Sequence, residues 1–151
     1  MRAAILLAEK TKEVSSRPIK KYIMRWDMFI KQLFDDFLGL EYEKLDEHHV
    51  RVKLPVKDLL INSAGVVHGG IISSMADVAM SNLIPANQEG KQQALTADLH
   101  VSFLKPASGA YLVANAKIVK QGRTLIRTEC SIFNDKNELV ATSKATLFRT
   151  H

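Results

Sequence analysis

The stretch NSAGVVHGGIISSMADVAMSNL, residues 62–83, contains an apolar run with a carboxylate in its middle. The run predicts a helix from about Gly69 to Ile84, because its apolar residues cover nearly every side of such a helix. They are Ile71, Ile72, Met75, Ala76, Val78, Ala79, Met80 and Leu83. A helix that is apolar all round is buried, and burying an unpaired charge is costly. Asp77 therefore needs either a partner or a function.

The second half of the chain has the period-two pattern of strands. In ALTADLHVSFL, the apolar residues Leu95, Ala97, Leu99, Val101 and Phe103 alternate with polar ones, which predicts one buried face. The turns KPASG, QG and NDKN separate this strand from AYLVANAKIVK, RTLIRTECSIF and ELVATSKATLFRT. Two shorter strands are expected around residues 40–46 and 49–54. Short loops favour antiparallel pairing, so we predict an α+β fold: a curved antiparallel sheet of five to six strands around one central helix.

The chain of 151 residues fits a single domain. Residues 22–38 predict an amphipathic helix lying against the sheet, with Trp26, Phe29, Ile30, Leu33 and Phe37 at helical spacing. We therefore expect a body over 22–151 and a loose basic arm over 1–21. A targeting peptide is the alternative for this arm, although Glu9 and Glu13 argue against it.

Charge and cysteine content exclude several classes of protein. The net charge is +5, but residues 1–31 carry eight Lys/Arg against three acids, so the rest is neutral and has no footprint for nucleic acid. No apolar run reaches the ~18 residues of a membrane span. Cys130 is the only cysteine, which excludes an internal disulfide and a cysteine metal cluster. His48 and His49 are interpreted as turn residues, and the cytoplasm is the expected location.

One stripe of the predicted helix is polar and holds the candidate chemistry. Gly70, Ser73, Ser74, Asp77 and Ser81 fall on this stripe at 3.6 residues per turn. At its mouth His68 and Gly69 precede backbone N–H groups that have no partner within the helix and that favour negative charge. An oxyanion site and a carboxylate facing the same cleft suit acyl transfer to water. From spacing alone, Asp77 could also be an exposed or core-edge carboxylate, and Asn62 a loop cap.

The motif N-x-x-G-x-x-H-G-G, with Asp nine residues after the His, resembles the hotdog-fold acyl-CoA thioesterases. The similarity is to their phenylacetate-pathway (PaaI-like) subgroup within the 4-hydroxybenzoyl-CoA thioesterase superfamily. TADLHVSFLKPASG resembles a strand of that family which ends in a basic residue, Pro and Gly. The last three predicted strands also match, so the resemblance covers about Phe34 to Phe148.

The resemblance implies a role for each site residue. Asp77 would be the general base or nucleophile, and the Gly69 N–H would polarise the thioester carbonyl. His68 and Asn62 would hold the substrate and the attacking water, with Thr96 a weaker candidate near that water. Substrate contacts are expected from Gly70 and Ser81. Lys105, Arg123 and Arg127 could contact the phosphates of coenzyme A, with solvated surface charge as the alternative. The family implies a homodimer or homotetramer with sites across the dimer interface. Coenzyme A is the leaving group, and no metal or redox cofactor is implied.

Two other functions of the same fold remain open. An acyl-CoA hydratase would need a His shortly after Asp77, but the next one is His100. A non-catalytic acyl-CoA-binding regulator would need a DNA-binding module, and residues 1–38 are too few for a helix-turn-helix. A serine-hydrolase mechanism lacks its G-x-S-x-G motif, and Cys130 fits a strand core better than a nucleophile.

Overall fold

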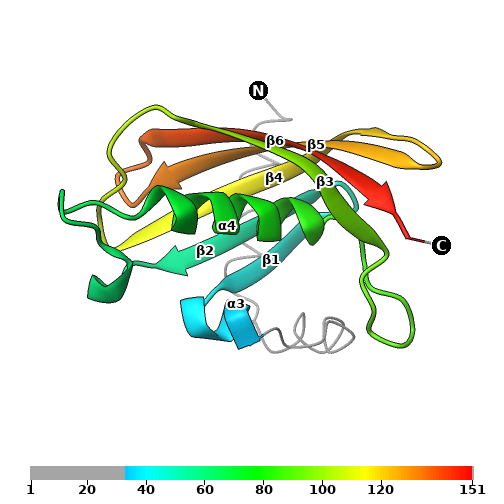
Figure 1. Cartoon of the computed structure of the whole chain (residues 1–151), viewed down its shortest axis with the longest axis horizontal. Helices are drawn as coiled ribbons and strands as arrows, with labels where there is room; N and C mark the ends of the chain where they lie inside the picture. The colour runs from blue at the N-terminus through cyan, green and yellow to red at the C-terminus, as the bar shows by residue number, and fades with distance from the viewer. Residues whose placement is uncertain (1–32, 151) are drawn as a thin grey trace, which may run out of the picture.

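A computed structural model describes residues 33–150 of the chain. Six strands form one antiparallel sheet in the order β1-β2-β4-β5-β6-β3, so β1 and β3 are its edges. The strands are β1 Glu41–Asp46, β2 His49–Pro55, β3 Ala94–Phe103, β4 Tyr111–Gln121, β5 Leu125–Asn134 and β6 Leu139–Arg149. The helix α4, Gly69–Ser81, lies across one face of the sheet (Figure 1). The predicted α+β architecture of a sheet around one long helix is confirmed.

Helix α4 supplies the centre of the core. Ile72, Met75, Ala76, Ala79 and Met80 are buried against the sheet, whereas Ile71 and Val78 are only half-buried. The expectation that the helix is apolar on every side and fully buried is therefore wrong for one of its faces.

The end of α4 also differs from the prediction, since the helix stops at Ser81 rather than Ile84. The side chain of Asn82 donates to the Val78 carbonyl at 2.8 Å, and its backbone N–H bonds back to the same turn. After Asn82 the backbone changes to i→i−3 bonds, from Leu83 to Met80 at 3.2 Å and from Ile84 to Ser81 at 3.3 Å, so the α-helical pattern ends there.

Strand β3 does not alternate evenly along its length. Its pairing with β6 shifts register between Thr96 and Asp98, which marks a bulge. Before the bulge Leu95 is 54% exposed and Thr96 is half-buried, while after it Leu99 packs against the core. The prediction that Leu95 and Leu99 share one apolar face is therefore wrong, because one extra residue reverses the side to which each side chain points. The bulge thus turns Thr96, predicted on the wet face, toward α4.

The short helix α3, Leu33–Leu38, is the described part of the helix predicted over 22–38. Its end is confirmed, since Gly39 has a positive φ of 72° and follows directly. Leu33 and Phe37 are exposed, however, and Leu38 is the residue that packs into the core. The predicted apolar face is therefore wrong for this part. Residues 22–32 and the arm 1–21 lie outside the described residues.

Candidate active site

The N-terminus of α4 presents free backbone donors. His68 precedes the helix, makes no side-chain cap, and accepts at its carbonyl from the N–H groups of Ile71 and Ile72. Within residues 33–150 the N–H groups of Gly69 and Gly70 have no hydrogen-bond partner. Such groups at the positive end of a helix dipole favour an oxyanion.

The loop before the helix is fixed by its own hydrogen bonds. The His68 N–H donates to the Leu60 carbonyl at 2.9 Å, in the short 3-10 helix η1, Asp58–Leu60. Asn62 Oδ1 accepts from the N–H groups of Ala64 at 2.9 Å and Val66 at 3.4 Å. Asn62 therefore caps the loop with its oxygen, which leaves its Nδ2 as the group available to a substrate. The imidazole of His68 is exposed.

Gly69 lies against an aromatic ring. A Cβ added to Gly69 would stand 3.2 Å from Phe103 Cζ, whereas one added to Gly70 would meet nothing within 4 Å. Phe103 is 54% exposed, although sequence analysis assigned it to the core face of β3. No sequence signal reveals this contact, because it joins the end of a strand to a helix start 34 residues earlier (103 − 69 = 34).

Asp77 has a partner on the neighbouring strand. Thr96 Oγ1 donates to Asp77 Oδ1 at 2.6 Å, and Ser81 Oγ lies 3.4 Å from Thr96 Oγ1. Since the only hydroxyl proton of Thr96 goes to the carboxylate, Ser81 is the donor in the second contact. Asp77 is half-buried, and its Oδ2 makes no hydrogen bond within the described residues. One carboxylate oxygen is thus held and the other is free to accept a proton.

Two members of the polar stripe are already satisfied. Ser73 Oγ donates to the Gly69 carbonyl and Ser74 Oγ to the Gly70 carbonyl, each at 2.8 Å. This bonding within the helix gives neither serine a free donor. The chemistry of the stripe therefore depends on the N-terminus of α4 and on Asp77.

Asp77 and Gly69 do not meet within one chain. They are eight residues apart on α4 (77 − 69 = 8), which at 1.5 Å per residue puts about 12 Å between them along the axis. A polarised carbonyl and its attacking water must lie about 3 Å apart. The expectation that both groups face one cleft fails for a single chain.

The three candidate phosphate-binding cations do not converge either. Lys105 follows β3 near Asn134, whereas Arg123 precedes β5 at its other end, about 30 Å away for a ten-residue strand. Arg127 bonds the Thr146 hydroxyl. It lies on the face of the sheet opposite α4, because it alternates with the buried Ile126 and Thr128.

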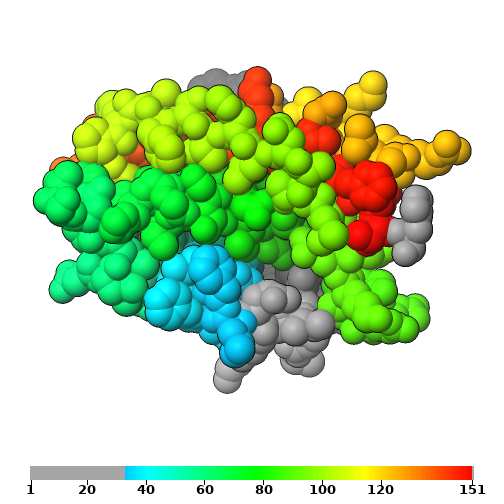
Figure 2. All heavy atoms as spheres, viewed as in Figure 1, coloured from blue at the N-terminus to red at the C-terminus, as the bar shows by residue number. Residues whose placement is uncertain are grey.

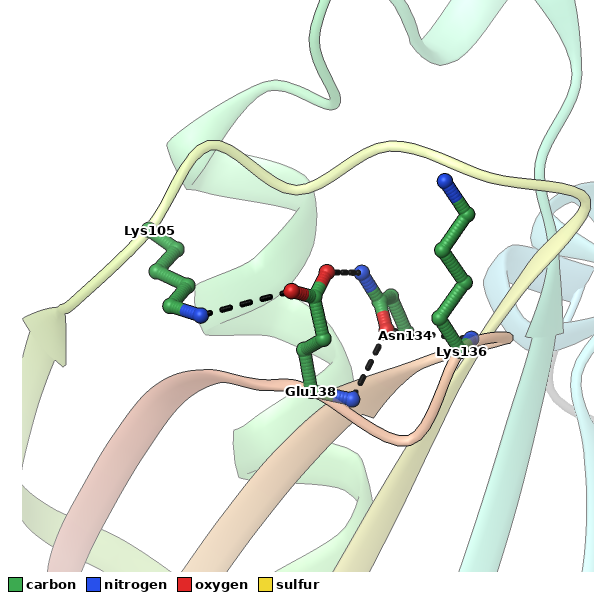
Figure 3. Close-up of polar contacts among 4 residues, drawn as sticks. All are labelled: Lys105, Asn134, Lys136 and Glu138. Atoms are coloured by element: carbon green, nitrogen blue, oxygen red, sulfur yellow. Dashed lines mark hydrogen bonds and ion pairs between the residues drawn. The ribbon is translucent and has the colours of Figure 1, made fainter.

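Lys105 belongs to a polar cluster at the β5–β6 turn (Figure 3). Its Nζ lies 3.4 Å from Glu138 Oε1, and Asn134 Nδ2 donates to Glu138 Oε2 at 2.8 Å. The amide of Asn134 and then the charge of Lys105 lower the pKa of the Glu138 carboxyl. A phosphate would have to compete with Glu138 for Lys105.

Other candidate centres are weak in the described part of the chain. Residues 33–150 hold no group of three His, Cys, Asp or Glu able to bind a metal ion. His49 Nδ1 lies 2.8 Å from the Asp46 carboxylate in the β1–β2 turn. Burial raises the pKa of the Cys130 thiol to about 12, which keeps it protonated.

No helix of residues 33–150 is long and apolar enough to cross a membrane.

A hollow of about 340 Å³ lies on the face opposite α4, lined by residues that include Asn115, Lys117, Glu129 and Ser131. It is therefore separate from Asp77 and Gly69, which belong to α4 itself.

Comparison with known proteins identifies the family of the chain. The Thioesterase superfamily family model matches residues 64–141, which include His68, Gly69, Asp77 and Thr96 but not Asn62. The medium/long-chain acyl-CoA thioesterase YigI of Escherichia coli is 21% identical over 136 residues, covering 80% of this chain and 88% of YigI.

Two solved structures share the fold. The E. coli PaaI protein from the phenylacetic acid degradation operon superposes with a TM-score of 0.72 at 23% identity, over 80% of this chain and 86% of PaaI. The BH2602 protein of Bacillus halodurans, solved with CoA, superposes with a TM-score of 0.72 at 28% identity, over 93% of each chain. The predicted hotdog fold is confirmed.

Proposed function

The chain belongs to the thioesterase superfamily and is a thioester hydrolase, and we propose that it hydrolyses acyl-CoA in a site shared by two subunits. The observation that carries the proposal is the pair of groups on α4: free N–H donors at Gly69, and a carboxylate at Asp77 with one free oxygen. Each fits one half of thioester hydrolysis, and about 12 Å of helix separates them.

A second copy of the chain can bring the two groups together. Strand β3 is an edge of the sheet, so its outer N–H and C=O groups can pair with the β3 of another copy. Two-fold symmetry then sets the two α4 helices antiparallel, with Gly69 of one subunit near Asp77 of the other. The half-buried Ile71 and Val78 on the open face of α4 are available for such a contact.

The chemistry follows from these positions. The Gly69 N–H of one subunit donates to the thioester carbonyl oxygen and stabilises the negative charge that develops there. Asp77 of the other subunit accepts a proton at Oδ2 from water, whose oxygen attacks the carbonyl carbon. The C–S bond then breaks, and the leaving thiolate of coenzyme A takes that proton. The products are a free acid and coenzyme A, and these steps require no metal or redox cofactor.

Thr96 prepares the carboxylate for this step. Its hydroxyl holds Oδ1, so the free Oδ2 is directed at the water rather than rotating. Ser81 in turn orients Thr96. On the other subunit, His68, Asn62 Nδ2 and Gly70 surround the carbonyl end of the substrate. The cytoplasm, where acyl-CoA is made and used, is the proposed location.

The test is release of thiol from a panel of acyl-CoAs, from short-chain through aryl-acetyl to long-chain, with the Asp77→Asn variant as control. Thiol release that depends on Asp77 is the expected result. Tight acyl-CoA binding without thiol release would instead identify a non-catalytic binding protein. Addition of water to an enoyl-CoA without thiol release would identify a hydratase.

A further inference from the structure

The outer face of the sheet, opposite α4, carries an exposed apolar row at one end. Leu95 on β3 and Leu125 on β5 are both direct register partners of Phe148 on β6. Leu95 is 54% exposed, and Leu125 and Phe148 are each 43% exposed. Val119, at a bulge of β4, adds a fourth exposed apolar side chain. Isolated exposed apolar residues are normal, but a contiguous group on three adjacent strands indicates a binding surface.

Cations border this row. Lys120 and Arg127 are register partners on β4 and β5, and Arg123 lies in the turn that joins these strands. None of the three forms an ion pair with a carboxylate among residues 33–150. The acidic residues of this face include Glu129, which pairs with Lys117 and Lys144, and Asp98, which is opposite Thr146. These seven residues (Leu95, Val119, Lys120, Arg123, Leu125, Arg127, Phe148) are called the outer-face patch below.

Part of the outer-face patch lies on a hairpin. Lys120 and Leu125 flank the β4–β5 turn that holds Arg123, and Figure 2 shows this hairpin extending beyond the body at one end. Residues 1–31 add eight Lys/Arg against three acids to the same chain, which also favours an anionic partner.

The combination of apolar and basic side chains selects among partners. A second copy across a two-fold axis would set the three cations near their own equivalents, which opposes association. Nucleic acid would satisfy the cations but leave Phe148 and its neighbours without apolar contacts, since phosphates dominate that binding. An anionic bilayer satisfies both sets, with the apolar side chains in the acyl region and the cations at the headgroup phosphates.

We propose that the outer-face patch docks the protein on an anionic phospholipid surface. The inference goes beyond the proposed hydrolysis and does not depend on it, because the patch is on the face of the sheet opposite Asp77. A hydrolase held there would meet amphiphilic thioesters, whose acyl chains partition into bilayers.

The experiment is co-sedimentation of the full-length protein with vesicles of phosphatidylcholine alone or with about 30% phosphatidylserine, without substrate. Binding to the anionic vesicles should exceed binding to neutral ones at least tenfold. Lys120→Gln/Arg123→Gln should weaken it about tenfold or more, as expected for the loss of two cations. Leu95→Ser/Val119→Ser should weaken it similarly, because these side chains are more than half exposed and their loss spares the core.

Matched controls lie elsewhere on the chain. Lys57→Gln/Lys136→Gln removes the same charge, and Leu33→Ser/Leu59→Ser removes exposed leucines outside the outer-face patch. Both control variants, once shown to be folded, should bind anionic vesicles as strongly as the parent protein.

Four results would overturn the proposal. They are the absence of binding to anionic vesicles by the folded protein, equal losses in the controls, loss of binding when free coenzyme A is added, and a patch variant that changes only the oligomeric state. The last two would assign the cations to the coenzyme and the apolar row to a contact between copies.

Discussion

The Thr96 hydroxyl lies 2.6 Å from Asp77 Oδ1 and joins a strand to the middle of the long helix. The contact exists because the β3 bulge turns Thr96 toward α4. It gives a half-buried carboxylate a neutral donor and leaves the second carboxylate oxygen open. This second oxygen is not among the buried polar atoms without a partner in residues 33–150, so water can reach it.

Asp77→Asn should keep the fold and lose at least ~100-fold in kcat, the lower range for removing a general base. The amide has the same volume, and its oxygen can still accept from Thr96. Thiol release and the thermal unfolding midpoint should be measured on the same sample. Near-normal turnover would remove Asp77 from the mechanism.

Thr96→Val should lower kcat about tenfold with little change in KM, since a hydrogen bond to a charged group contributes roughly 1.5–3 kcal/mol. Thr96→Ser keeps the hydroxyl and should retain most of the activity. Steady-state kinetics of the two variants separate positioning from packing. Loss of activity in Thr96→Ser with near-parental activity in Thr96→Val would show that the methyl group matters, not the donor.

Gly69→Ala should abolish most activity, because the new Cβ stands beside the N–H that polarises the carbonyl. The Cβ also meets Phe103 Cζ at 3.2 Å, but this ring is 54% exposed and can move, so stability should change by less than about 1 kcal/mol. Gly69→Ala/Phe103→Ala removes the contact and should not recover turnover. If the double variant regains activity, the loss in Gly69→Ala comes from the contact with the Phe103 ring and not from blocking of the Gly69 N–H.

Gly109→Ala should destabilise the protein by at least about 1 kcal/mol more than Gly65→Ala. Gly109 has φ +124°, and a Cβ there would stand 2.4 Å from Asp135 Oδ1, whose carboxylate holds the Ala110 N–H through Oδ2 at 2.7 Å. Gly65 has φ +76° with nothing within 4 Å, so Gly65→Ala measures the strain of a positive φ without a steric contact. Urea unfolding of both variants gives the comparison, and equal stabilities would show that the Asp135 contact gives way freely.

The sequence predicts the architecture well because the periodicity is strong in each element. The alternation in β4, β5 and β6 and the apolar run in α4 each match one element of the structure. The sequence does not predict local irregularities or contacts between distant elements. The bulge after Thr96 reverses Leu95, since a single inserted residue leaves no mark on composition.

The sequence predicts only part of the candidate site. His68, Gly69 and Asp77 stand out by type and spacing, and the structure gives each a specific backbone or side-chain setting. Spacing along a helix also set Gly69 at the start of the stripe that holds Asp77, and it is the rise per residue that keeps the two apart. The contacts of Phe103 with Gly69 and of Thr96 with Asp77 both come from β3, a strand distant in sequence from α4, and pattern alone does not pair these residues.

The most direct measurement is thioesterase activity after Asp77→Ala and His68→Ala chains are unfolded together and refolded. Each variant refolded alone should be nearly inactive, because both sites of its dimer are damaged. A shared site predicts that half the dimers are mixed and that roughly a quarter of all sites are sound, by two-fold symmetry. Activity near that fraction of the parent enzyme is the expected result. No recovery, with mixed dimers shown to form, would place the whole site within one chain and contradict the account.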